Sequence, residues 1–184
     1  MLPTWATKMR DLFRSGSVAQ FLLHGNVFDV IPHGDRQLSL KAFLDEAMFA
    51  SYDTVLMYDR SRGVRATRGA DDWGTWLQQA LGDANPISST REPGVALELI
   101  DRYLLRTLNL AAIQQRGDPA ASGIRKVAVV VDFAEFVVPR ADAAQLGGPF
   151  AANVVKVLGW ANDPAILQAN IITCLLYTSD AADE

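Results

Sequence analysis

The sequence predicts an α/β domain with a mainly parallel sheet, and three observations support this prediction. The first is an apolar run, Val127–Val131, that ends on Asp132 without polar alternation. A β-branched run of this kind suits a strand that is buried on both faces. The second is the alternation of strand-like and helix-like segments along the chain, which favours parallel strands joined by crossover helices. The third is size, because 184 residues with 49% hydrophobic content suffice for one domain with a core.

Each expected element rests on a local pattern of apolar residues and end signals. In the first half these are a helix capped by Thr4 and ended by 15–17, a strand at 18–27, a turn at 32–35, a helix capped by Ser39 and a strand at 52–58. In the second half they are a short helix capped by Asp71 or Asp72, a long helix from Pro93 to about Gln115, the strand ending on Asp132, a helix at 150–161 and a last strand from Asn170.

The last eleven residues, Cys174–Glu184, have the sequence expected of a read-through adapter, so we expect a non-native tail. A mobile natural C-terminus is the alternative. The expected domain therefore covers residues 1–173, and the sheet is expected to be incomplete at its C-terminal end.

Composition excludes several classes of protein. The formal charge is −4, and it is −1 without Asp180, Asp183 and Glu184 of the expected tail, so nothing indicates a nucleic-acid-binding protein. The single cysteine also lies in that tail, which leaves no disulfide or thiolate metal site in the rest. No apolar stretch reaches the length of a membrane span, and the start lacks an export signal. We therefore expect a cytoplasmic protein.

Asp132 is the first candidate functional residue, because α/β sheets bind ligands beyond the carboxyl ends of their strands. Its strand, KVAVVVDFAEF, resembles the Walker B strand of P-loop ATPases, in which the acid holds Mg²⁺. Glu135 follows three places later rather than directly, so it shares a cation or orients a water only if the backbone turns between them. The alternative is structural: Asp132 caps the next segment or pairs with an arginine.

Gly25 and Asn26 stand where a phosphate-binding loop would follow the first strand. The chain contains no G-x-x-x-x-G-K-[ST] motif, and Lys41 comes too late, inside the next helix. A simple tight turn at Gly25-Asn26 is the alternative. An arginine cluster (Arg60, Arg62, Arg65 and Arg68) is a candidate for binding phosphate, with a solvated loop as the alternative. His24 is a candidate acid or base, with a hydrogen-bonded, structural histidine at a strand end as the alternative.

Three segments together, FLLHGNVFDV, YDTVLMYDRSRGV and KVAVVVDFAEFVVP, resemble the N-terminal region of a bacterial family of large AAA-type ATPases. The resemblance spans nearly all of residues 1–173. It implies a P-loop NTPase-like three-layer sandwich whose phosphate site is degenerate, with the intact P-loop in a downstream module. It also implies ATP and Mg²⁺ as cofactors, Asp132 as the metal ligand, Glu135 as the catalytic residue and Gly25-Asn26 as the cofactor-binding position.

The leading hypothesis is a degenerate nucleotide-binding-like module that contacts a neighbouring AAA module or other subunits, including further copies of the chain. Hydrolysis would then belong to the downstream part. Two rivals stay open: a self-sufficient Mg²⁺-dependent phosphohydrolase that uses Asp132 and Glu135, and a catalytically inert protein-interaction domain.

Overall fold

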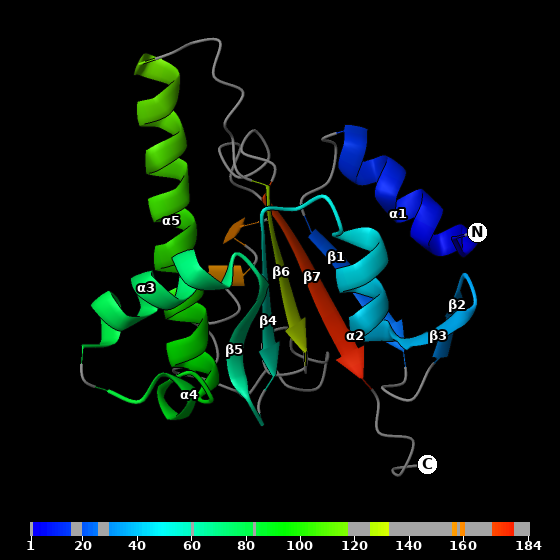
Figure 1. Ribbon diagram of the computed structural model, residues 1–184, viewed down its shortest axis with the longest axis horizontal. Coiled ribbons are helices and arrows are strands. Elements are labelled where there is room, and N and C mark those ends of the chain that lie inside the picture. The colour runs from blue at the N-terminus through cyan, green and yellow to red at the C-terminus, as the bar shows by residue number, and fades with distance from the viewer. Residues whose placement is uncertain are drawn as a thin grey trace.

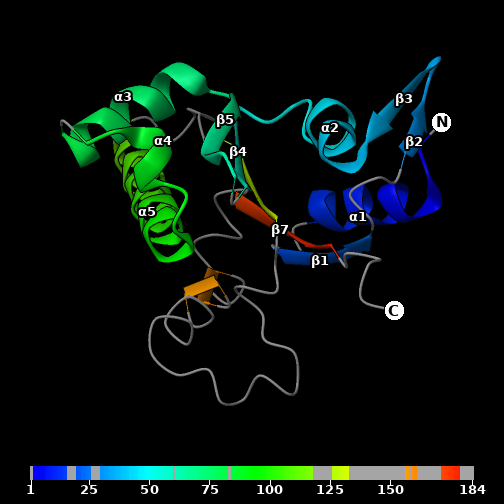
Figure 2. The same cartoon turned by 90° about the horizontal axis from the view of Figure 1, so that it is seen from below.

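A computed structural model of the chain describes residues 2–15, 20–25, 30–59, 61–82, 84–117, 126–132, 156–157, 159–160 and 171–178. The described part has three layers, with a sheet between two layers of helices (Figures 1 and 2). The α/β sandwich predicted from the sequence is therefore confirmed.

The central layer is a five-stranded sheet in the order β1-β7-β6-β4-β5. Its strands are β1 (Gln20–Gly25), β4 (Thr54–Asp59), β5 (Gly63–Arg68), β6 (Val127–Asp132) and β7 (Ile171–Thr178). The first four strands in this order run parallel, and β5 pairs antiparallel with β4 at the edge. Gly25 pairs with Thr178 and Asp132 with Leu176 of the strand between them. Both candidate positions therefore lie where the parallel strands end, on the carboxyl side of the sheet.

Helices cover both faces of this sheet. One face carries α1 (Thr4–Ser15) and α2 (Leu40–Phe43), which continues as the π-helix η1 (Leu44–Met48). The other carries α3 (Ala70–Leu81), α4 (Pro86–Ser89) and the long α5 (Pro93–Gly117). A separate hairpin of β2 (Val30–His33) and β3 (Arg36–Ser39) lies beside α1 and α2 (Figure 1).

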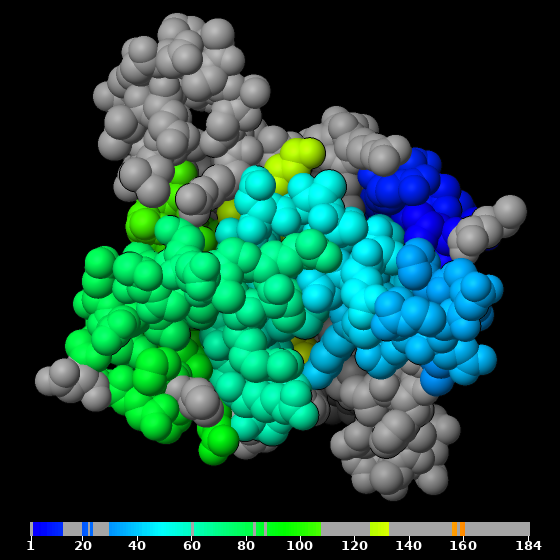
Figure 3. Space-filling view, viewed as in Figure 1, coloured from blue at the N-terminus to red at the C-terminus, as the bar shows by residue number. Residues whose placement is uncertain are grey.

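Strand β6 explains why the sequence shows an unbroken apolar run. Val127, Val129 and Val131 pack in the core with α3 and α5, whereas Ala128 and Val130 pack with α1, α2 and η1. Successive side chains of a strand point to opposite faces, so a strand covered on both faces needs apolar residues at every position. In the space-filling view β6 is visible only as small patches near its two ends (Figure 3).

Two elements differ from the sequence expectation. The turn expected at 32–35 is present at Gly34-Asp35, where Gly34 has φ +59°, but the residues on either side of it, including Pro32 and His33, pair as the β2–β3 hairpin. The arginine cluster was interpreted as a solvated loop, but Arg65 and Arg68 lie in β5, where antiparallel pairing with β4 provides the backbone partners. Both are short edge or satellite strands, for which local composition is a weak signal.

The ends of two further elements differ from the expectation. Helix α3 begins after Gly69, not after Asp71 or Asp72, which both lie inside its first turn. The last strand was expected from Asn170 but spans Ile171–Thr178, so it enters the segment expected to be a non-native tail. The origin of that segment stays a prediction. Of the helix expected at 150–161, only Lys156, Val157, Gly159 and Trp160 are among the described residues, and they are helical.

Gly69 is required by both its backbone and its surroundings. Its φ of +66° lies in the left-handed region, and an added Cβ would lie 2.6 Å from Thr54 Oγ1 and 2.9 Å from the Asp53 carbonyl oxygen. The close approach joins the start of α3 to the start of β4.

We expect Gly69→Ala to lower the free energy of unfolding by about 2 kcal/mol or more, because it adds left-handed strain and a clash with backbone. Urea unfolding followed by circular dichroism measures the change. Gly74→Ala is the matched control, since Gly74 lies in the same helix and an added Cβ meets nothing within 4 Å. The control should be neutral or stabilise by up to about 1 kcal/mol. Equal effects of the two variants would contradict the assignment.

Candidate functional site

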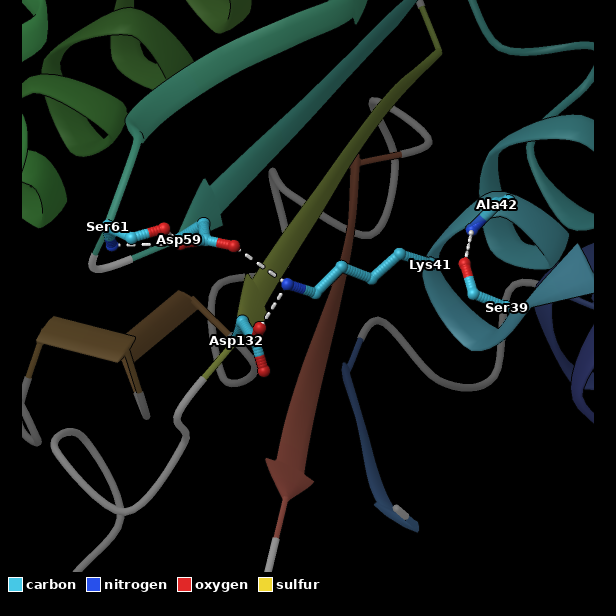
Figure 4. A network of polar contacts seen from close by, with 6 residues as sticks. All are labelled: Ser39, Lys41, Ala42, Asp59, Ser61 and Asp132. Carbon is cyan, nitrogen blue, oxygen red and sulfur yellow. Dashed lines mark hydrogen bonds and ion pairs between the residues drawn. The ribbon is translucent and has the colours of Figure 1, made fainter. Parts of the chain in front are cut away.

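The candidate site is built around Lys41, which lies in the first turn of α2. Helix α2 begins directly after strand β3, with Ser39 in an extended conformation as its N-cap. The Ser39 hydroxyl oxygen accepts a hydrogen bond from the backbone N–H of Ala42 at 3.4 Å. This cap fixes where the helix begins, and Lys41 reaches from there toward the ends of β4 and β6 (Figure 4).

Two aspartates meet Lys41 at that edge of the sheet. β4 and β6 are parallel neighbours, with Tyr58 opposite Val131, so Asp59 and Asp132 come next on adjacent strands. The Lys41 ammonium donates to Asp59 Oδ2 at 2.9 Å and forms an ion pair with Asp132 Oδ2. The exposed fractions of the side chains are 30% for Lys41, 14% for Asp59 and 2% for Asp132. The most deeply buried carboxylate is thus compensated by an internal cation.

Ser61 completes the arrangement from the β4–β5 turn. Its backbone N–H and its hydroxyl donate to Asp59 Oδ1 at 2.8 Å and 2.5 Å. One oxygen of Asp59 therefore binds Ser61 and the other binds Lys41, which fixes the orientation of the carboxylate (Figure 4). Asp59 is in this way a positioning group for the Lys41 ammonium.

The pKa values of the two less buried members move in the directions that favour their charged forms. Burial acts to lower the pKa of Lys41, but its hydrogen bonds to Asp132 and Asp59 and their charges outweigh burial and raise it. Burial acts to raise the pKa of Asp59, but hydrogen bonds from Lys41 and Ser61 and the Lys41 charge lower it well below its usual range. Lys41 and Asp59 are therefore both charged at neutral pH.

The structure places the predicted site residues unevenly. Asp132 lies at the carboxyl end of β6 and Gly25 at the carboxyl end of β1, with β7 between the two strands. Asn26 and Glu135 lie outside the described residues, so their expected roles stay predictions. The structural alternative for Asp132, capping the next segment or pairing with an arginine, stays a prediction, and Lys41 is a partner that the structure shows.

Sequence reasoning missed Lys41 and Asp59. It dismissed Lys41 as lying too far inside the helix, but the helix begins at Leu40, and Lys41 is its second residue. A usable signal was that two apolar strands, TVLMYD and VAVVVD, both end on an aspartate. Among the arginines, Arg68 interacts with Asp45 of η1 and does not join this group.

A bound Mg²⁺ and a phosphate fit these residues poorly while Lys41 keeps its contacts. The ammonium occupies an oxygen of each carboxylate, and strand β3 leads directly into α2. In the described ranges, no group of three or more His, Cys, Asp or Glu side chains could hold a metal ion.

Comparison with protein families matches residues 1–182 to the AAA+ chaperone, N-terminal Rossmann-like domain. The chain belongs to this family. The parallel sheet with helices on both faces agrees with the Rossmann-like description, and membership confirms the resemblance to the N-terminal region of AAA-type ATPases. Searches of curated proteins and of solved structures returned no match. Among the described helices of this AAA+ chaperone domain, none is long and apolar enough to cross a membrane.

Acid titration tests the Asp59 contacts. Because the pKa of Asp59 is lower in the folded state, its stabilisation is complete above the unfolded value of about 3.9 and is lost as the pH falls toward the folded value. We expect Asp59→Asn to reduce the loss of stability below about pH 4, measured by urea unfolding at several pH values.

Asp35→Asn serves as the matched control, since Asp35 is exposed in the β2–β3 turn. It should keep the acid dependence of the wild-type domain. Identical pH profiles for the wild-type and Asp59→Asn domains would contradict the Lys41–Asp59–Ser61 arrangement.

Proposed function

We propose that this domain is a degenerate nucleotide-binding-like module of an AAA+ chaperone that acts in the cytoplasm. In this proposal the domain binds Mg·ATP weakly or not at all. It contacts a downstream ATPase module or neighbouring subunits and couples its own conformation to theirs. Hydrolysis belongs to that other module. Family membership supports the AAA+ part of the proposal, and the geometry of the site supports the degenerate part.

The observation that carries the proposal is the entry into α2. A phosphate site needs a loop that turns several backbone N–H groups toward one point at a helix N-terminus. Here strand β3 leads directly into the helix, and the Ser39 side chain already accepts the N–H of Ala42. The β2–β3 hairpin is also packed on α2, since Ile31, Leu38 and Phe43 share one core cluster.

The phosphohydrolase alternative requires Asp132 to hold Mg²⁺ and Glu135 to orient water. The ion pair between Lys41 and Asp132 argues against it, because a lysine that neutralises the metal ligand competes with the metal. A catalytically inert interaction domain is the third alternative. It would bind no nucleotide, and its deletion from the chaperone would leave the ATPase activity unchanged.

Isothermal titration of the purified domain with Mg·ATP tests the proposal. We expect no binding at micromolar nucleotide, because the Ala42 N–H at the start of α2 is already accepted by Ser39 and Lys41 is paired with two carboxylates. Micromolar binding that Asp132→Asn abolishes and Asp35→Asn preserves would overturn the degenerate assignment. Phosphate release by this domain alone, lost in Asp132→Asn, would favour the phosphohydrolase.

A further inference from the structure

The two aspartates that contact Lys41 converge on one point. Asp59 and Asp132 lie on adjacent parallel strands at nearly the same level, and each directs its Oδ2 atom to Lys41 Nζ. Magnesium sites commonly use one or two carboxylates and fill their remaining positions with water or phosphate oxygens. The Lys41 ammonium therefore lies where two carboxylates would share a cation (Figure 4).

The charges of the group explain why this position has to be filled. Asp132 is almost fully buried, and a buried carboxylate without a positive partner is strongly unfavourable. Lys41 supplies one positive charge for two carboxylates, so the three side chains together carry a charge of −1 when all are ionised. A divalent cation would neutralise both acids, but Lys41 already occupies the Oδ2 atoms that face the position between them.

We propose that Lys41 makes an autoinhibitory contact: its ammonium occupies the cation position between Asp59 and Asp132 and prevents Asp132 from holding a divalent cation. This inference rests on the proposed function, because it describes how the crevice of the degenerate module is kept closed. It assigns the closing role to one residue of α2 and the positioning role to Asp59.

The contact persists through the neutral pH range, and the packing of the hairpin against α2 and η1 supports it. The contacts with both carboxylates raise the pKa of Lys41, so it remains charged in the neutral range. Arg36 of β3 forms hydrogen bonds with both carboxylate oxygens of Glu46 of η1, at 2.8 Å and 3.4 Å. His33 also packs edge-on against Phe43, with ring centroids 5.9 Å apart. The hairpin and helix are thus tied to each other as well as to the two strand ends.

Manganese binding in the absence of nucleotide tests the contact directly. The variants are Lys41→Met, which removes the charge, and Lys41→Gln, which keeps hydrogen-bonding capacity without charge. We expect the wild-type domain to show no saturable Mn²⁺ binding by isothermal titration up to ~1 mM, and each variant to bind one ion with a Kd at least tenfold lower, in the range of weak oxygen-ligand sites.

The matched control is Lys41→Met combined with Asp132→Asn, which should lose the Mn²⁺ site that Lys41→Met gains. In thermal melts, Mn²⁺ should raise the Tm of the two single variants and leave the wild-type Tm unchanged. This stabilisation readout also applies if a single variant is only partly folded without the ion.

Three results would overturn the inference. One is saturable Mn²⁺ binding by the wild-type domain with the same affinity as the variants. Another is the absence of binding by folded Lys41→Met and Lys41→Gln domains. The third is that both variants stay unfolded with and without Mn²⁺, which would make Lys41 a purely structural counter-ion. None of these readouts involves nucleotide, so the nucleotide titration can fail or succeed independently.

Discussion

The central constraint in this domain is that strand β6 must be covered on both faces and must still end on a charged group. Its four valines and one alanine, at 127–131, are inaccessible to water because α3 and α5 pack on one face and α1, α2 and η1 pack on the other. Asp132 closes the strand with its side chain 2% exposed. The same layers that stabilise the core therefore bury a carboxylate, and a cation has to be brought to it.

Lys41 meets this requirement, and its contacts join helix α2 to the ends of β4 and β6. Removing one partner of a buried ion pair typically costs about 3–5 kcal/mol, because the other charge is left without compensation. The exposed pair between Arg36 and Glu46, by contrast, is of a kind that contributes about 1 kcal/mol or less. The position of α2 over the sheet therefore combines this ion pair at the strand ends with the apolar contacts beneath the helix.

The same arrangement brings two of the expected site residues to one side of the Rossmann-like sheet. Strands β1 and β6 still bring Gly25 and Asp132 to one edge, as a nucleotide-binding sheet would. The β2–β3 hairpin leads directly into α2, and Lys41 of that helix is directed to the two carboxylates.

The sequence by itself determined the class of the fold and one site residue. The unbroken run at 127–131 predicted a doubly covered strand, and Asp132 at its end was identified as a site candidate, because these signals are local and strong. Helix α5, beginning at Pro93 as predicted, is another such case. The sequence also predicted the helix cap at Ser39, but it did not show that Lys41, two residues later, would meet two aspartates.

Only the tertiary structure decided which groups Asp132 meets. Lys41 and Asp59 are separated from it by 91 and 73 positions in the chain, and each has an ordinary local context. They come together because β4 and β6 pair in parallel and α2 crosses their ends. Pairing partners and helix position depend on the packing of the whole core, so they are not encoded in any single segment.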